Sequence, residues 1–460
     1  MSVASRSIAK AENRFVPLAI CGVVSILLLA GLFRASGVSL VLPALVVGAA
    51  ALLWAAFQFP MGNLGGVLAF LPVFPLAFLI AKYFGPSYIG SLEGCDRVVM
   101  LMLFFILWQR NGIRLAAPDW FLMAMFGLAL LRLEFAGKLL PLLSDFNFMI
   151  AYAVGRVAVL TSEQEKLWAK RAVWIVAVLA ILGMVEIFFI GDGPRTALFL
   201  VADPEITFNG ALGNSFHATG YLGMRESATS LGPLHFAPLC MAALIVWWVY
   251  FRNPLPGAMI AAGLICTVTR SAWVGTALAI PFVAVLMGQQ KRFFRYAALG
   301  LALFAASVPV LGLSDYLFAT KTMQDPSAEG HAEDLAIGLA YVSGHPLGVG
   351  PGNAGRWATD KFNNSSAVTV DDTYLTLASE YGIPTLLCFL GFLLTALRLS
   401  CRERTQVGYA AAGILFGFSA VMTFFLVHDI FPLACWIWFP VGLAVRSSTR
   451  LGMKPASVPA

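Results

Sequence analysis

The sequence predicts an all-α, polytopic integral membrane protein, and three observations support that fold class. Hydrophobic residues make up 59% of the chain and charged residues only 12%, which is too little charge for the surface of a soluble protein. Mean hydropathy is +0.82. Apolar runs of about 17 to 25 residues, the length that crosses a bilayer as a helix, recur along the chain.

The predicted spans follow from these runs. Clear runs cover 15–33, 38–57, 64–84, 172–190, 228–251, 296–313, 373–397 and 407–427. Shorter or more polar runs cover 89–108, 120–131, 146–160, 256–269, 272–288 and 431–445. Together they predict about 14 transmembrane helices, within a range of about 12 to 14. The first run is long for the core of a cleaved signal peptide, so we expect it to be retained.

The positions of Lys and Arg predict the orientation. If both termini are cytoplasmic, most basic residues fall in inner segments, among them Arg6, Lys10 and Arg14 before the first span, and most acidic residues fall outside. Residues 1–450 then form one transmembrane domain, with a short cytoplasmic tail at 451–460. Two long segments, 191–227 and 314–372, are predicted to be periplasmic.

Several function classes are disfavoured. The net charge of +6 comes mostly from residues that flank apolar runs, so it gives no reason to expect nucleic acid as a partner. No phosphate-binding G-x-x-x-x-G-K-[ST] loop is present. The seven cysteines and five histidines show no disulfide framework and no metal-ligand spacing, so we predict neither a metal nor a cofactor.

The arginines predicted on the outer face are informative, because the topology does not require them there. They include Arg195, Arg225, Arg270 and Arg356. Each could extend its charge to the lipid headgroups. The alternative is a cluster that binds a lipid-linked pyrophosphate, since guanidinium stays charged and presents a fork of donors to phosphate oxygens.

Two further motifs lie in or after the second outer segment. The stretch His345–Asn353, His-Pro-Leu-Gly-Val-Gly-Pro-Gly-Asn, is either a plain glycine and proline loop, the interpretation that composition favours, or a nest of backbone N–H groups for an anion. Asp371 and Asp372 precede an apolar run. One aspartate is expected to cap that helix, with Asp372 the better candidate. The other, Asp371, is a candidate general base.

Three segments in this order resemble the O-antigen ligase and polymerase superfamily of membrane glycosyltransferases. They are Thr269–Trp273, the stretch His345–Asn353, and the stretch from Asp371 to Thr385, in which Gly382 and Thr385 have the spacing of the family motif. The resemblance covers roughly residues 172–397. Asp371 and Asp372 stand where the ligases carry His followed by Asn, Ser or Gln, and this difference favours a repeat-unit polymerase.

The resemblance implies glycosyl transfer at the periplasmic face of the bacterial inner membrane, from a glycan on undecaprenyl pyrophosphate to a second lipid-linked repeat, for exopolysaccharide or O-antigen synthesis. Arg225 and Arg270 would bind the pyrophosphate, and Asp371 would deprotonate or orient the acceptor hydroxyl. The other candidate substrate-binding residues are Arg195, Glu226, His345, Gly350, Asn353, Arg356, Asp372 and Tyr374. A chain-length regulator or flippase of the same pathway is a candidate partner.

Two other functions compete with this one. A ligase would transfer a glycan to lipid A core or another acceptor. A transporter or flippase of lipid-linked sugars would do no chemistry, and it would be expected to show pseudo-symmetric halves with broken helices near the midplane. We see no such symmetry in the sequence.

Overall fold

A computed structural model describes residues 95–136, 139–191, 233–310, 326–354, 368, 372–424 and 431–451. These residues form helices and no β-strand. The helices are α6 (Cys95–Asn111), α7 (Ala117–Ala136), α8 (Leu139–Asp145), α9 (Phe148–Val157), α10 (Ser162–Val185) with a short π-helix η1 (Glu186–Ile190), α14 (Pro233–Tyr250), α15 (Pro254–Cys266), α16 (Arg270–Leu286), α17 (Gln290–Val310), α19 (Pro326–Gly344), α21 (Thr373–Tyr381), α22 (Ile383–Glu403), α23 (Gln406–Val421) and α24 (Phe431–Leu451).

The helices agree well with the predicted spans. Each span predicted between residues 89 and 445 overlaps a helix, and the three N-terminal spans lie outside the described residues. Ser162–Ile190, Gln290–Val310 and Ile383–Glu403 are long and apolar enough to cross a membrane. The described residues are therefore consistent with an all-α membrane protein, while the number of spans remains a prediction.

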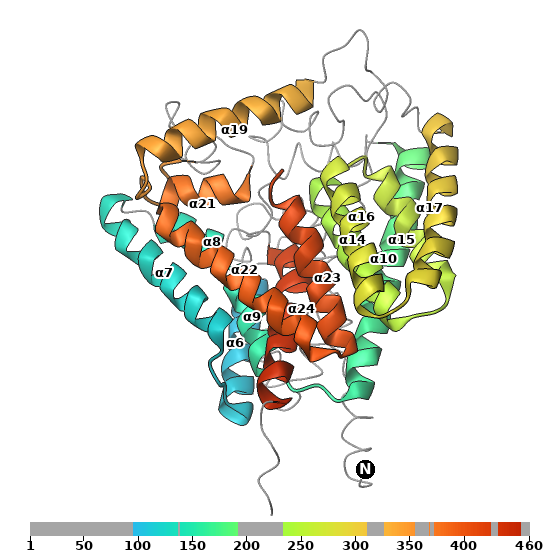
Figure 1. Cartoon of the computed structure of the whole chain (residues 1–460), viewed down its shortest axis with the longest axis horizontal. Coiled ribbons are helices and arrows are strands. Elements are labelled where there is room, and N and C mark those ends of the chain that lie inside the picture. The colour runs from blue at the N-terminus through green and yellow to red at the C-terminus, as the bar shows by residue number, and fades with distance from the viewer. Residues whose placement is uncertain are drawn as a thin grey trace, which may run out of the picture.

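Two features of the outer region differ from the prediction. The run 373–397 is two helices, because α21 ends at Tyr381 and α22 begins at Ile383 after Gly382, whose φ is +90°. The membrane-length helix is thus Ile383–Glu403. In the predicted outer segment 314–372, α19 forms a helix that we did not predict. Figure 1 shows α19 and α21 lying across one end of the bundle formed by α22, α23 and α24.

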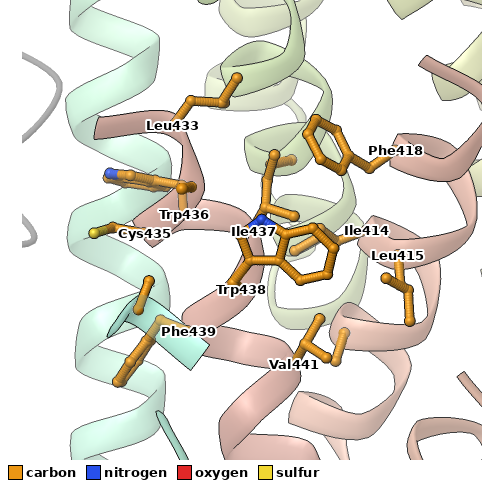
Figure 2. Packing of buried hydrophobic residues seen from close by; sticks show 14 of the residues in the cluster. Ile414, Leu415, Phe418, Leu433, Cys435, Trp436, Ile437, Trp438, Phe439 and Val441 are labelled. Atoms are coloured by element: carbon orange, nitrogen blue, oxygen red, sulfur yellow. The ribbon is translucent and has the colours of Figure 1, made fainter. Parts of the chain in front are cut away.

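Close backbone contacts join the helices of the bundle. A Cβ on Gly155 of α9 would lie 2.3 Å from the carbonyl oxygen of Phe439 on α24. A Cβ on Gly275 of α16 would lie 2.8 Å from the carbonyl oxygen of Gly417 on α23. Small residues let membrane helices approach in this way. The side chains around these contacts complete the core, and Figure 2 shows Trp438 of α24 facing Phe418 of α23.

A polar cluster holds the opposite end of the bundle, which we call the inner end after the predicted topology. Arg156 of α9 forms a buried ion pair with Asp119 of α7 at 2.8 Å, and the Tyr152 hydroxyl donates to the same carboxylate. Arg446 of α24 donates to the carbonyl oxygens of Gly112 and Arg156. These contacts bring the predicted inner loops after α6 and α9 together at one end. The side of the membrane that this end faces remains a prediction.

Candidate active site

The turn between α15 and α16 places Arg270 at the outer end of the bundle. The Trp273 indole and the Thr267 hydroxyl both donate to the carbonyl oxygen of Leu264, at 2.9 and 2.7 Å. These two bonds close the turn, and Arg270 is the first residue of α16, where its side chain is half-buried. The motif residues around Arg270 therefore build the turn that presents it.

The same turn contains a strained residue. Val268 has a φ of +49° and is buried. A β-branched side chain is a genuine outlier in the left-handed region, at a cost of about 1–3 kcal/mol, and such strain persists where the surrounding structure enforces it. Strain of this kind clusters at functional sites, and here it lies two residues before Arg270.

Asp372 immediately precedes α21 and forms its N-cap. Its carboxylate accepts a hydrogen bond from the backbone N–H of Leu375 at 2.8 Å, so the predicted helix cap is confirmed. Burial raises the pKa of the Asp372 carboxyl, and hydrogen bonds from the N–H groups of Leu375 and Tyr374 oppose that rise. Asp372 thus has a structural role, and its part in substrate binding remains a prediction.

The outer end of α23 lies between Arg270 and Asp372. The backbone N–H of Thr373 donates to the carbonyl oxygen of Met422 at 3.0 Å, just after α23 ends. A Cβ on Gly275 would lie 3.0 Å from the Val421 side chain, and Arg270 is five residues before Gly275, roughly 7.5 Å along the axis of α16. The structure therefore brings the Arg270 motif and the start of α21 to the same end of the bundle.

The stretch His345–Asn353, which we call the glycine loop, is fastened to the joint between α21 and α22. The N–H groups of Val349 and Gly350 donate to the carbonyl oxygens of Ser379 and Glu380, at 2.9 and 2.8 Å. The N–H of Ile383 donates to the carbonyl oxygen of Pro346 at 2.9 Å. Two sequence motifs that are separate in the chain thus form one structural unit.

Glycine is required in this unit because the backbones touch. Gly348 and Gly382 both have positive φ, and a Cβ on either would lie 2.5 Å from backbone atoms of the other segment. The N–H groups of Gly348, Val349 and Gly350 are all hydrogen-bonded within the protein. That arrangement favours the plain structural loop over the anion-binding nest.

The other candidate residues of the glycine loop also make internal contacts. The Asn353 amide donates to the carbonyl oxygen of Val349 at 3.0 Å. His345 is exposed, and its ring lies 4.6 Å from that of Tyr341. Tyr374 on α21 donates its hydroxyl to the carbonyl oxygen of Ser419 at 2.9 Å. Arg195, Arg225, Glu226, Arg356 and Asp371 lie outside the described residues.

A buried acidic cluster next to the glycine loop was missed by the sequence analysis. Glu380 and Asp145 are 1% and 5% exposed, and the Tyr381 hydroxyl donates to the Asp145 carboxylate at 2.6 Å. Glu380 lies in the run that we predicted as a single span. An ionisable residue within such a run is a functional candidate by default, and that signal could have identified it.

Neither a metal-binding group nor a cavity is associated with the predicted site residues that the structure describes. In the part of the chain that the structure describes, no three His, Cys, Asp or Glu side chains form a group that could hold a metal ion. An apolar cavity lies between α10, α14, α23 and α24, with Trp168, Tyr250, Trp436 and Phe439 among its lining residues. None of the predicted site residues lines it.

Comparison with known proteins supports the predicted superfamily. Residues 255–390 match the family model described as O-antigen ligase. The matched segment contains Arg270, the glycine loop, Asp372 and the α21–α22 joint, so it includes the described part of the site. The match supports the O-antigen ligase and polymerase superfamily and a role in polysaccharide assembly at a membrane, without separating polymerase from ligase. No curated protein matches the chain.

Proposed function

We propose that the protein polymerises undecaprenyl-pyrophosphate-linked oligosaccharide repeats at the periplasmic face of the bacterial inner membrane. The observation that carries this proposal is the placement of Arg270 and the start of α21 around the outer end of α23. Arg270, an arginine suited to pyrophosphate, and Asp372, which caps α21, share one end of the bundle, and Asp371 precedes Asp372 in the chain. Arg270 and both aspartates lie within residues 255–390, the segment that matches the family model described as O-antigen ligase.

The reaction is a displacement at the anomeric carbon of the donor glycan. The acceptor hydroxyl of a second lipid-linked repeat gives up its proton, and its oxygen forms the new glycosidic bond. The bond from the anomeric carbon to the pyrophosphate oxygen breaks, and undecaprenyl pyrophosphate leaves with the electron pair. Because the pyrophosphate is already a good leaving group, no nucleotide sugar is needed.

Each named residue has one task in this step. Arg225 and Arg270 hold the pyrophosphate and stabilise the negative charge that develops as it leaves. Asp371 takes the proton of the acceptor hydroxyl, for which it must be ionised and within hydrogen-bond reach. The positive charge of the arginines lowers the pKa of a nearby carboxyl and so favours that ionised form.

A ligase is the second candidate, since it would use the same donor and leaving group with a different acceptor. The carboxylate pair Asp371–Asp372 favours the polymerase, because the resembling ligases carry His in the place of Asp371. A chain-length regulator or flippase of the same pathway would be the expected protein partner. In this proposal both termini are cytoplasmic and the active end is periplasmic.

The test is polymer formation by the purified protein supplied with lipid-linked repeats. We expect Arg225→Ala and Arg270→Ala each to abolish polymer formation, and the Lys variants to recover only part of it, because Lys lacks the guanidinium fork. Arg295→Ala is the matched control, since Arg295 is exposed at the base of α17. Wild-type activity in both site variants would contradict the proposal. Transfer to lipid A core without chain growth would favour the ligase.

A further inference from the structure

Three elements meet at the Asp145–Glu380–Tyr381 cluster. Asp145 is the last residue of α8, and Glu380 and Tyr381 are the last two residues of α21. The Glu380 side chain is hydrogen-bonded to Asp145 and accepts from the backbone N–H of Gly352 in the glycine loop. Its Oε2 atom is buried and has no hydrogen-bond partner in the structure. The cluster therefore connects α8, α21 and the glycine loop through side chains shielded from water.

Two buried carboxyl groups in contact do not ionise together, because the like charges repel and each loses its hydration. Burial, followed by the charge of Asp145, raises the pKa of the Glu380 carboxyl well above its usual value. With one proton between them, one carboxyl donates to the other. The remaining negative charge is then compensated by the Tyr381 hydroxyl and the Gly352 N–H. The bonds between Glu380 and Asp145, from Tyr381 to Asp145 and from Gly352 to Glu380 can all form in that state.

We propose that Asp145 and Glu380 share one proton, and that this pair, with Tyr381, positions α21 and the glycine loop for glycosyl transfer. These are positioning residues that do not touch substrate, and their role rests on the function proposed above. The pair fixes the C-terminal end of α21, while Asp371 and Asp372 precede its N-terminal end. Movement of α21 would displace the base from the acceptor, whereas Arg270, which belongs to α16, would still bind the pyrophosphate.

The chain offers a matched control. Tyr381 and Tyr152 are both buried and each donates its hydroxyl to a buried aspartate, at 2.6 Å to Asp145 and at 2.8 Å to Asp119. Each also keeps an edge-on contact with a phenylalanine ring, Phe146 or Phe392, that a Phe variant would preserve. The two tyrosines lie at opposite ends of the bundle. Tyr381→Phe and Tyr152→Phe therefore remove the same bond at two places.

The reporter is a cysteine that replaces Val342. Val342 of α19 is buried against Leu375 and Ala378 of α21, so Val342→Cys should be protected from a maleimide while this region stays packed. Labelling of the parent protein gives the background from its own cysteines. In the Val342→Cys protein, Tyr381→Phe should raise the labelling rate about tenfold, the effect of losing one hydrogen bond of about 1.4 kcal/mol. Tyr152→Phe should leave the rate unchanged.

Two further measurements complete the test. Tyr381→Phe should lower kcat for polymer formation with little change in KM, because the arginines still bind the donor. Glu380→Gln should retain protection and activity within about twofold of the parent, since an amide donates to Asp145 as the protonated carboxyl does. Equal labelling in the two tyrosine variants would overturn the proposal, and so would a Glu380→Gln protein as impaired as Tyr381→Phe. If the three variants label as expected but the parent makes no polymer, the proposed function is refuted and the shared proton stays supported.

Discussion

Replacing Gly348 with alanine tests whether the glycine loop depends on backbone contact with the α21–α22 joint. The new Cβ would lie 2.5 Å from both the Glu380 carbonyl oxygen and the Gly382 nitrogen. Restoring an ordinary contact requires the loop to retreat by about 1 Å, which breaks the bonds that Val349 and Gly350 donate, at 2.9 and 2.8 Å.

The size of the effect follows from these contacts. Each lost bond costs about 0.5–1.5 kcal/mol, and a side chain in the left-handed region adds about 1–2 kcal/mol at a φ of +77°. Together they amount to about 2–5 kcal/mol of local destabilisation. In the Val342→Cys protein, Gly348→Ala should therefore raise maleimide labelling by about 30-fold or more, and polymer formation should fall with it.

Two other glycines separate the contributions. Gly288 also has a positive φ, +66°, but no atom lies within 4 Å of its added Cβ, so Gly288→Ala imposes strain alone. Gly127 lies within α7, has neither constraint and should gain up to about 1 kcal/mol of helix stability as alanine. Both controls should leave the labelling of the Val342→Cys protein unchanged. Equal labelling in the Gly348 and Gly288 variants would show that the backbone contact does not hold the loop.

The remaining predictions concern the aspartate pair and the topology. Asp371→Asn should abolish polymer formation with little loss of stability, whereas Asp372→Asn should be tolerated because Asn caps a helix about as well as Asp. If assays on purified lipid-linked repeats gave the reverse pattern, Asp372 would be the general base and Asp371 the helix cap. Cysteines placed at Ser327 and Ser366 should react with an impermeant label in intact spheroplasts. Reaction only after permeabilisation would put the segment 314–372 on the inner side and remove the proposed mechanism.

Properties that depend only on residues close together in the chain were predictable from the sequence. Hydropathy averaged over about 20 residues identifies a membrane helix whatever its neighbours are, and Gln290–Val310 of α17 satisfies that criterion in the structure. Helix capping is also local, since a side chain bonds a backbone N–H only three residues away. That is why Asp372 could be predicted as the cap, and the structure shows its bond to the N–H of Leu375.

The superfamily was predictable for a related reason. The motif around Arg270, the glycine loop and the spacing from Asp371 to Gly382 are short patterns in a fixed order. The match of residues 255–390 to the O-antigen ligase family supports that interpretation. The outer-face arginines stayed ambiguous, because an arginine that reaches headgroups and one that binds pyrophosphate have the same residue type and the same position relative to a span.

By itself, the sequence determined that this is a membrane protein and where most of the described helices lie. Tertiary structure decided that α21 and α22 are separate helices, because hydropathy does not register one positive φ at Gly382. It also decided that the glycine loop rests on that joint, and that Asp145 meets Tyr381 across a sequence separation of 236 residues. Contacts at that separation depend on how the helices pack, so no local pattern of residues specifies them.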